Sequence, residues 1–200
     1  MSGTAPQAIL APQAQKQKKM QRMETFFNMN VDALTKNLTC TKTALNNMRA
    51  SRSAFSVALN HSGGYACFGP FDVDRLIPYN HVFLNLGENY NAQASNFTVP
   101  LSGVYSLAFT VYSGGSLDGE LPAAAGTAGD LLVNDQVVAS LKENNRLDRV
   151  DSATAVVSVK LKAGDTVAVS LPKGYHVCDD DNYFNTFTGF LLYPCDVMKE

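Results

Sequence analysis

Acidic and aromatic residues gather in one predicted loop near the end of the chain. The segment "KGYHVCDDDNYFN" (173–185) contains an acidic triplet, Asp179-Asp180-Asp181. Neighbouring carboxylates repel one another, so they favour solvent, a cation or a basic partner. Aromatic rings can stack on sugar rings, and amides hydrogen-bond sugar hydroxyls. The loop therefore predicts a surface that binds carbohydrate or other surface patterns, with a plain solvated loop as the alternative; its residues are Tyr175, Asp179, Asp180, Asn182 and Tyr183.

Catalytic chemistry is not indicated. The sequence has no H-E-x-x-H, no G-x-S-x-G and no phosphate-binding glycine loop, and its three histidines are scattered. We therefore expect a protein that is not an enzyme and that requires no cofactor.

Composition narrows the class of protein further. The 200 residues are 46% hydrophobic and 17% charged, with a net charge of −2, which suits one globular domain plus an appendage and does not point to nucleic acid. No apolar run of about 18 residues is present, so no membrane insertion is expected. Three matches to the N-glycosylation pattern (Asn37, Asn60 and Asn96) and an even number of cysteines, four, favour a secreted, extracellular protein whose signal peptide has been removed.

The first quarter of the chain predicts a helix. Residues 1–19 are mostly small and polar and read as a disordered arm, and residues 20–50 show apolar residues spaced alternately four and three apart. This spacing forms a heptad seam at Phe27, Val31, Leu34, Leu38, Thr41, Leu45 and Met48. The seam favours a self-associating coiled coil, and the alternative is one amphipathic helix packed on its own domain.

From Ala54 onward, the pattern changes to short β-type runs separated by turn residues. Alternation is clear in "VYSLAFTVY" (104–112) and "AVVSVKL" (155–161), and "LLVNDQVV" (131–138) predicts a hairpin that turns at Asn134-Asp135. Regular short strands without helices between them predict an all-β sandwich or jelly roll.

Several of these runs resemble the C1q globular domain of the C1q/tumour-necrosis-factor superfamily. The resemblance rests on "AFSVAL" (54–59), "NYNAQASNFTVPLSGVYSLAF" (89–109), "LKAGDTVAVSL" (161–171) and "TFTGFLLYP" (186–194), which occur in the family's order. The chain departs from the family at Ser95, where glycine is usual, and in its longer segment 60–80. No collagen-like tract is present, and the helix stands in its place.

The resemblance implies a ten-stranded jelly roll that assembles as a homotrimer. The domain would span residues 54–195, with 196–200 as a tail. The last strand, "TFTGFLLY", would lie centrally beside the first, and its nearly continuous apolar run suits burial on both faces. Candidate residues for the trimer core are Tyr105, Phe187, Gly189 and Leu191.

Two further sets of residues follow from the resemblance. The stretch "DRVDSATA" (148–155) is similar to the family segment whose aspartate ligates calcium, so Asp151 and its neighbour Asp148 are candidate calcium ligands; the alternative is a turn aspartate. In this fold a Cys67–Cys178 disulfide would tie the long 60–80 segment to the domain. Cys40, at an outward heptad position, and Cys195 are candidates for disulfides between trimers.

The sequence therefore predicts a secreted, non-enzymatic homotrimer of the C1q-like lectin or innate immune type. One alternative is a structural matrix, coat or adhesive protein whose self-assembly is its function. The other is a receptor-binding signalling ligand of the cerebellin or tumour-necrosis-factor-like type.

Overall fold

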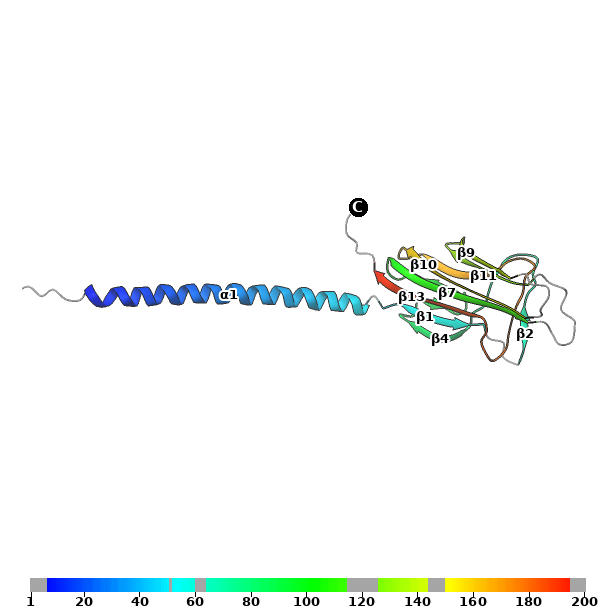
Figure 1. Cartoon of the computed structure of the whole chain (residues 1–200), viewed down its shortest axis with the longest axis horizontal. Helices are drawn as coiled ribbons and strands as arrows, with labels where there is room; N and C mark the ends of the chain where they lie inside the picture. The colour runs from blue at the N-terminus through cyan, green and yellow to red at the C-terminus, as the bar shows by residue number, and fades with distance from the viewer. Residues whose placement is uncertain (1–6, 51, 60–63, 115–125, 144–149, 195–200) are drawn as a thin grey trace, which may run out of the picture. The chain divides into compact units, whose positions relative to one another are not determined.

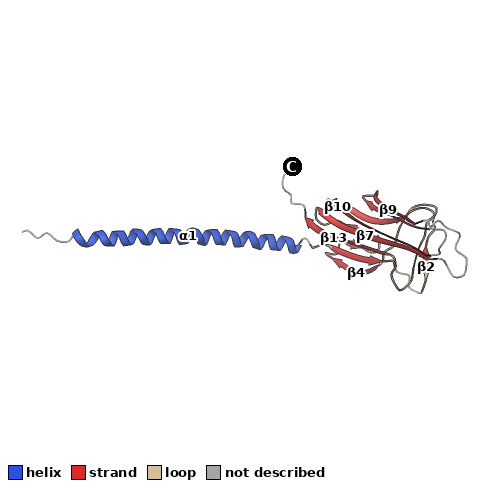
Figure 2. Ribbon diagram, viewed as in Figure 1, coloured by secondary structure: helices blue, strands red, loops and turns tan. Residues whose placement is uncertain are grey.

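The structure is a computed structural model that describes residues 7–50, 52–59, 64–114, 126–143 and 150–194 (Figure 1). The chain divides into two compact units, Met1–Ala50 and Ser51–Glu200. The first contains a single helix and the second contains the β-strands, as the colouring of Figure 2 shows.

Helix α1 runs from Gln7 to Ala50. It begins well before residue 20, so most of the arm expected to be disordered is helical. The segment "QAQKQKK" (13–19) explains the difference, because Gln, Ala and Lys are good helix formers even without an apolar pattern. The seam residues Phe27, Leu34 and Leu38 are 66%, 67% and 55% exposed. Among the described residues, no helix combines the length and the apolar character needed to cross a membrane.

The first sheet of the β unit has five antiparallel strands in the order β10-β7-β13-β1-β4. Their bounds are β1 Ala54–Ala58, β4 His81–Leu86, β7 Gly103–Gly114, β10 Val150–Leu161 and β13 Thr186–Pro194. The last strand lies in the centre and pairs with the first, with Phe55 opposite Gly189 and Val57 opposite Phe187. The central position expected for this strand is confirmed.

The second sheet follows the order β5-β6-β11-β8-β9, with β3 also paired to β11. Its strands are β3 Arg75–Leu76, β5 Tyr90–Asn91, β6 Asn96–Thr98, β8 Thr127–Val133, β9 Gln136–Glu143 and β11 Thr166–Leu171. A small third sheet pairs β2 (Ala66–Phe68) with β12 (Val177–Asp179). The first two orders contain five strands each, so the ten expected strands are present and the all-β jelly roll is confirmed. The additional strands β2 and β3 lie in the long 60–80 segment, and β12 lies in the predicted 173–185 loop.

The core lies between the two large sheets and is built by period-two alternation. On β7, Tyr105, Leu107, Phe109 and Val111 are at most 1% exposed, and the residues between them are partly exposed. The Phe55 ring lies 4.6 Å from that of Phe97 and 4.7 Å from that of Phe187, measured between centroids. The second sheet therefore covers only the inner side of the first sheet, and the outer side of the first sheet is not part of this core.

Candidate functional site

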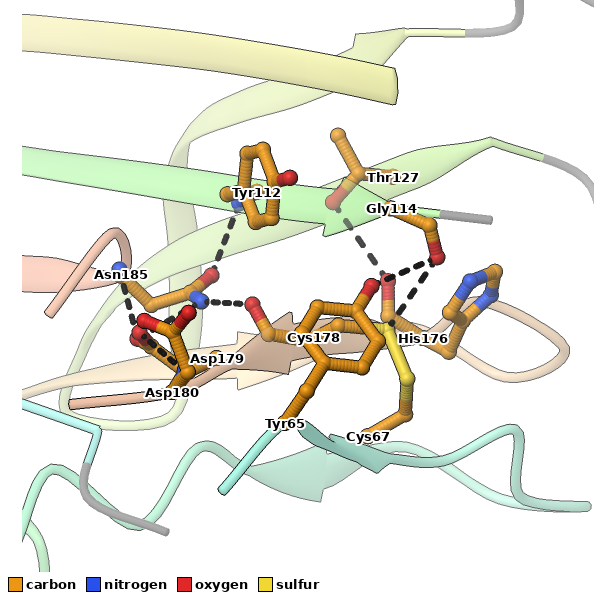
Figure 3. Close-up of a disulfide and its surroundings, with 10 residues drawn as sticks. All are labelled: Tyr65, Cys67, Tyr112, Gly114, Thr127, His176, Cys178, Asp179, Asp180 and Asn185. Carbon is orange, nitrogen blue, oxygen red and sulfur yellow. Dashed lines mark hydrogen bonds between the residues drawn. A yellow bond between two sulfur atoms is a disulfide. The ribbon is translucent and has the colours of Figure 1, made fainter. Parts of the chain in front are cut away.

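The acidic triplet does not form one solvated cluster. Figure 3 shows Asp179 beside Asn185. Asp179 is fully buried at the end of β12. Its Oδ1 accepts hydrogen bonds from the backbone N–H groups of Asp180 and Phe184, both at 2.9 Å, and its Oδ2 accepts them from the N–H of Asn185 at 2.8 Å and from Asn185 Nδ2 at 3.0 Å. Four donors satisfy this carboxylate, so Asp179 is a structural residue and its expected role in ligand binding is corrected.

Asn185 extends this network to the core sheet. Its side-chain Nδ2 donates to the carbonyl of Cys178 at 2.7 Å, and its Oδ1 accepts from the N–H of Tyr112 on β7 at 2.7 Å. A buried polar network is stable only when every member is paired, which holds for Asn185 and Asp179. The network therefore fixes the start of the loop that carries the remaining candidate residues.

Those remaining residues lie at the surface. Asp180 Oδ1 accepts hydrogen bonds from the backbone N–H of Asn182 at 2.7 Å and from its Nδ2 at 2.9 Å, which closes a tight turn. Tyr183 follows with a φ of 57°, a conformation that is costly for a bulky residue. Asp180 and Tyr183 are partly buried, and Asp181 and Asn182 are exposed.

Tyr183 joins an aromatic cluster that sequence reasoning missed. Its ring stacks on His81 of β4 at 4.3 Å and meets Phe83 edge-on at 5.2 Å, and His81 meets Phe83 at 4.7 Å. We call His81, Phe83 and Tyr183 the β4 aromatic cluster. Phe83 is 52% exposed. About a hundred residues of chain separate β4 from Tyr183, so no local pattern could reveal this contact.

Tyr175, another of the predicted ligand-binding residues, lies apart from this cluster. It packs partly against the core, and Lys142 Nζ lies 5.9 Å from its ring centroid.

The disulfide favoured from the sequence is present between Cys67 of β2 and Cys178 of β12 (Figure 3). Tyr65 supports it by donating its hydroxyl to the carbonyl of Gly114 at 2.7 Å. His176 lies beside it and is only 7% exposed, with no hydrogen-bond partner for its Nδ1 in the described part of the chain. Burial lowers the pKa of His176 below the ordinary histidine value.

The other candidate residues fall at scattered places. Asp151 is 8% exposed on β10 opposite Ser113, and its Oδ2 lies close to Gly126; Asp148 is outside the described residues. The described residues contain no group of three or more side chains that could hold a metal ion, so calcium binding stays a prediction.

The glycosylation and cysteine candidates are divided between the two units. Asn37 is exposed on helix α1, and Asn96 begins β6 and is partly buried. Cys40 is free and exposed. Asn60 and Cys195 lie outside the described residues.

The four residues expected in a trimer core face inward instead. Tyr105 and Phe187 are fully buried within one chain. A Cβ on Gly189 would lie within about 2.5 Å of the Phe55 ring and 2.7 Å of Leu107, so this glycine makes room for the chain's own core. Leu191 is partly buried against the same core. The alternation of β13 was assigned to the wrong face, because apolar residues occupy both of its faces.

The outer face of the first sheet is the larger candidate site. Strand register places on it three rows of five residues; they are Ser158-Ser106-Phe190-Ala54-Leu86, Val156-Ala108-Thr188-Ser56-Leu84 and Thr154-Thr110-Thr186-Ala58-His81. None of these residues is Asp, Glu, Lys or Arg. The centre is small and hydroxylic, with Ser56 and Thr188 oxygens 3.1 Å apart and Thr110 and Thr154 oxygens 2.8 Å apart.

Large apolar side chains border this small centre. Val156 is 67% exposed, Leu84 47%, Leu86 45% and Phe190 44%. Exposed large apolar side chains around an uncharged centre are typical of a protein–protein contact, although Lys160 lies at the border of this region on β10. The geometry therefore defines an all-β sandwich with an uncharged, partly apolar region on the outer face of its first sheet.

Comparison with known proteins agrees with this class. A model of the C1q domain family matches residues 54–192, and the chain therefore belongs to the C1q domain family. C1q and tumour-necrosis-factor-like domains are non-enzymatic binding or signalling modules that form homotrimers, and C1q domain proteins are typically extracellular.

Individual relatives are distant. The chain is 28% identical to Caprin-2 of Danio rerio over 142 residues, which cover 71% of this chain and 14% of that protein's length. The globular domain of zebrafish complement 1qA matches with a TM-score of 0.52 and 19% identity, covering 72% of this chain and 99% of that one. Murine APRIL at pH 5.0 matches with a TM-score of 0.52 and 15% identity, covering 70% and 99%. These two structures show the shared fold alone.

Proposed function

We propose that this chain is a secreted, non-enzymatic homotrimeric recognition protein that binds carbohydrate or other surface patterns. The observation that carries the proposal is the part of the outer face of the first sheet that the three uncharged rows form. Charged side chains are costly to bury, so a region that lacks them while exposing Val156, Leu84 and Phe190 suits contact with further copies of the chain. The disulfide supports an extracellular location, because disulfides persist in oxidising compartments.

Helix α1 supports the same assembly. Its seam residues from Phe27 to Leu45 are exposed in a single chain, and burying each of the large ones would contribute about 1.5–3 kcal/mol. We infer that three copies of residues 20–50 form a coiled coil, which keeps the chains together as the β domains associate. Trimerisation would then convert weak individual sites into tight multivalent binding.

Recognition is assigned to the exposed end of the 179–185 loop. Asp180 and Asn182 offer a carboxylate and an amide near the surface, and Tyr183 offers part of its ring. These groups supply hydrogen-bond acceptors, donors and an apolar surface, the combination that a sugar requires. The buried network of Asp179 and Asn185 holds this end of the loop in place, which lowers the entropic cost of binding.

The trimer is tested first by native mass. Val156→Glu and Phe190→Glu each place a carboxylate on the outer face, and we expect either change to shift the mass measured by light scattering from trimer towards monomer. Val137→Glu is the matched control, because Val137 is 56% exposed on β9 of the other sheet. An unchanged trimer in both outer-face variants would contradict the assigned face. A glycan array probed with the trimer then tests recognition.

A second candidate function is structural self-assembly, which the free and exposed Cys40 on helix α1 favours. Disulfides between trimers at this position would build large extracellular assemblies. Large species on non-reducing electrophoresis that disappear in Cys40→Ser, together with an empty glycan array, would favour this function over recognition.

A further inference from the structure

A pocket unrelated to the outer face lies where the long 60–80 segment meets the second sheet. Its volume is about 540 Å³, within the range of small-molecule sites, and its lining residues are Pro70, Phe71, Asp72, Val73, Arg75, Lys173 and Gly174. None of these residues belongs to the three outer-face rows, so the pocket is separate from the proposed trimer face.

The walls of the pocket are held by the fold. Arg75 pairs with Leu171 where β3 joins β11. The N–H of Gly174 donates to the carbonyl of Phe71 at 3.0 Å, and the N–H of Lys173 donates to Asp74 Oδ1 at 2.8 Å. The adjacent disulfide anchors β2, which precedes this segment. A pocket fixed in this way is preorganised for a ligand.

The pocket is lined by side chains of both charges, and its two cationic groups are accessible to a ligand. Two cationic side chains and one carboxylate line it, which leaves one net positive charge. The Arg75 guanidinium lies over the Phe71 ring, 5.4 Å from its centroid, a contact that leaves its N–H groups available at the edge. Within the described residues, neither Arg75 nor Lys173 forms an ion pair. Asp74 is nearby and accepts the Lys173 N–H with one carboxylate oxygen, and with its charge included the four charged groups balance, so an anion would be held by direct contacts with Arg75 and Lys173 and not by a net positive charge.

We propose that this pocket binds an acidic sugar residue, with its carboxylate or sulfate group held by Arg75 and Lys173. Arginine and lysine form strong charge-assisted hydrogen bonds with such anions. Asp72 accepts hydrogen bonds from the sugar hydroxyls, a role that a site for a bare anion would not need. The inference rests on the proposed recognition function and names both a ligand class and a place outside the 179–185 loop.

The test measures binding of defined probes by saturation-transfer NMR and calorimetry. Methyl glucuronide tests the carboxylate, glucose 6-sulfate tests the sulfate, and methyl glucoside is the neutral control. We expect one or both acidic sugars to bind and the neutral sugar not to bind. Arg75→Gln and Lys173→Gln should each weaken binding at least about tenfold, because each removes a charge-assisted hydrogen bond. The control Lys162→Gln, in the exposed β10–β11 turn, should leave the affinity unchanged.

Two further variants separate the roles of the charges. Arg75→Lys keeps the charge without the two-pronged geometry and should give an intermediate loss. Asp72→Asn should weaken the sugars without weakening inorganic sulfate, because only the sugars have hydroxyls. The substituted side chains are exposed, so native mass and circular dichroism should stay normal.

Three results would overturn the proposal: equal binding of the acidic sugars by the wild-type protein and both Gln variants, equal binding of methyl glucoside, or no binding of either acidic sugar at millimolar concentration. The glycan array separates this failure from that of the proposed function. If the trimer binds only neutral glycans, the acidic-sugar site is contradicted and the recognition function is supported. If the trimer binds no glycan on the array, both proposals are contradicted.

Discussion

The two faces of the first sheet both carry large apolar side chains, but they are completed in different ways. The inner face is covered by the chain itself: Phe187 and Tyr105 are fully buried, and Gly189 leaves space for the Phe55 ring. The outer face carries Phe190 and Val156, which are 44% and 67% exposed in a single chain. The same strands therefore contribute one face to folding and the other to the proposed assembly.

The use of both faces explains why the last strand of the sequence, β13, is apolar along almost its whole length. On β13, Phe187, Gly189 and Leu191 point into the sandwich, and Thr188 and Phe190 point away from it. Apolar residues on both faces remove the alternation that would distinguish the two sides. An apolar strand of this kind shows that both faces are used, but it does not show which face meets a second chain.

The largest expected effect is the difference between alanine substitutions at Phe187, on the inner face, and at Phe190, on the outer face. Phe187→Ala opens a cavity in the core and should lower the free energy of unfolding by about 3–5 kcal/mol. Phe190→Ala should leave the β domain folded and instead raise the protein concentration at which trimers dissociate. Urea unfolding at several protein concentrations, together with native mass, distinguishes the two effects. If Phe190→Ala lost as much stability as Phe187→Ala in the dissociated chain, the assignment of the two faces would be wrong.

A second contrast between buried and exposed groups lies within the acidic triplet. Asp179→Asn keeps the shape of the side chain but removes the charge that accepts four hydrogen bonds, and we expect a loss of about 2–3 kcal/mol. Asp181→Asn is the matched control, because Asp181 is exposed. It should leave the urea midpoint unchanged. Equal midpoints for the two variants would contradict the structural role of Asp179.

Much of the fold could be predicted because its signals are local. Period-two alternation identified β7 and β10, and Asn134-Asp135 marked the β8–β9 hairpin, where both residues adopt positive φ angles of 49° and 62°. Asn and Asp tolerate this conformation better than other non-glycine residues, so this pair of residues was enough to predict the turn. The pairing of Cys67 with Cys178 could be favoured only once the resemblance had supplied a fold.

The candidate site was less predictable because its contacts are not local. Three adjacent aspartates look alike in sequence, but β12 directs Asp179 into a buried network with Asn185. The β4 aromatic cluster joins His81 to Tyr183 through tertiary packing, and the start of helix α1 depended on residues with high helix propensity and no apolar pattern. For Asp179 and the aromatic cluster the missing information was which side chains the fold brings together, whereas the start of the helix was missed because local helix propensity was not weighed without an apolar pattern.

The smallest expected effect concerns pH and the buried His176. Burial favours its neutral form, so its pKa in the folded protein lies below the value of about 6.5 in the unfolded chain. The unfolded state therefore binds the proton first as the pH falls. Stability should be full above about pH 6.5 and should decrease as the pH drops from there to the folded-state pKa.

His176→Gln removes this titration and should flatten the dependence of the urea midpoint on pH between neutral and mildly acidic conditions. The wild-type protein in the same buffers is the reference. The difference between it and the variant isolates the buried histidine from the other groups that titrate over the same range. Parallel pH profiles for His176→Gln and the wild-type protein would show that the protonated ring is accommodated beside the disulfide after all. The buried position beside the disulfide would then tolerate a positive charge on His176.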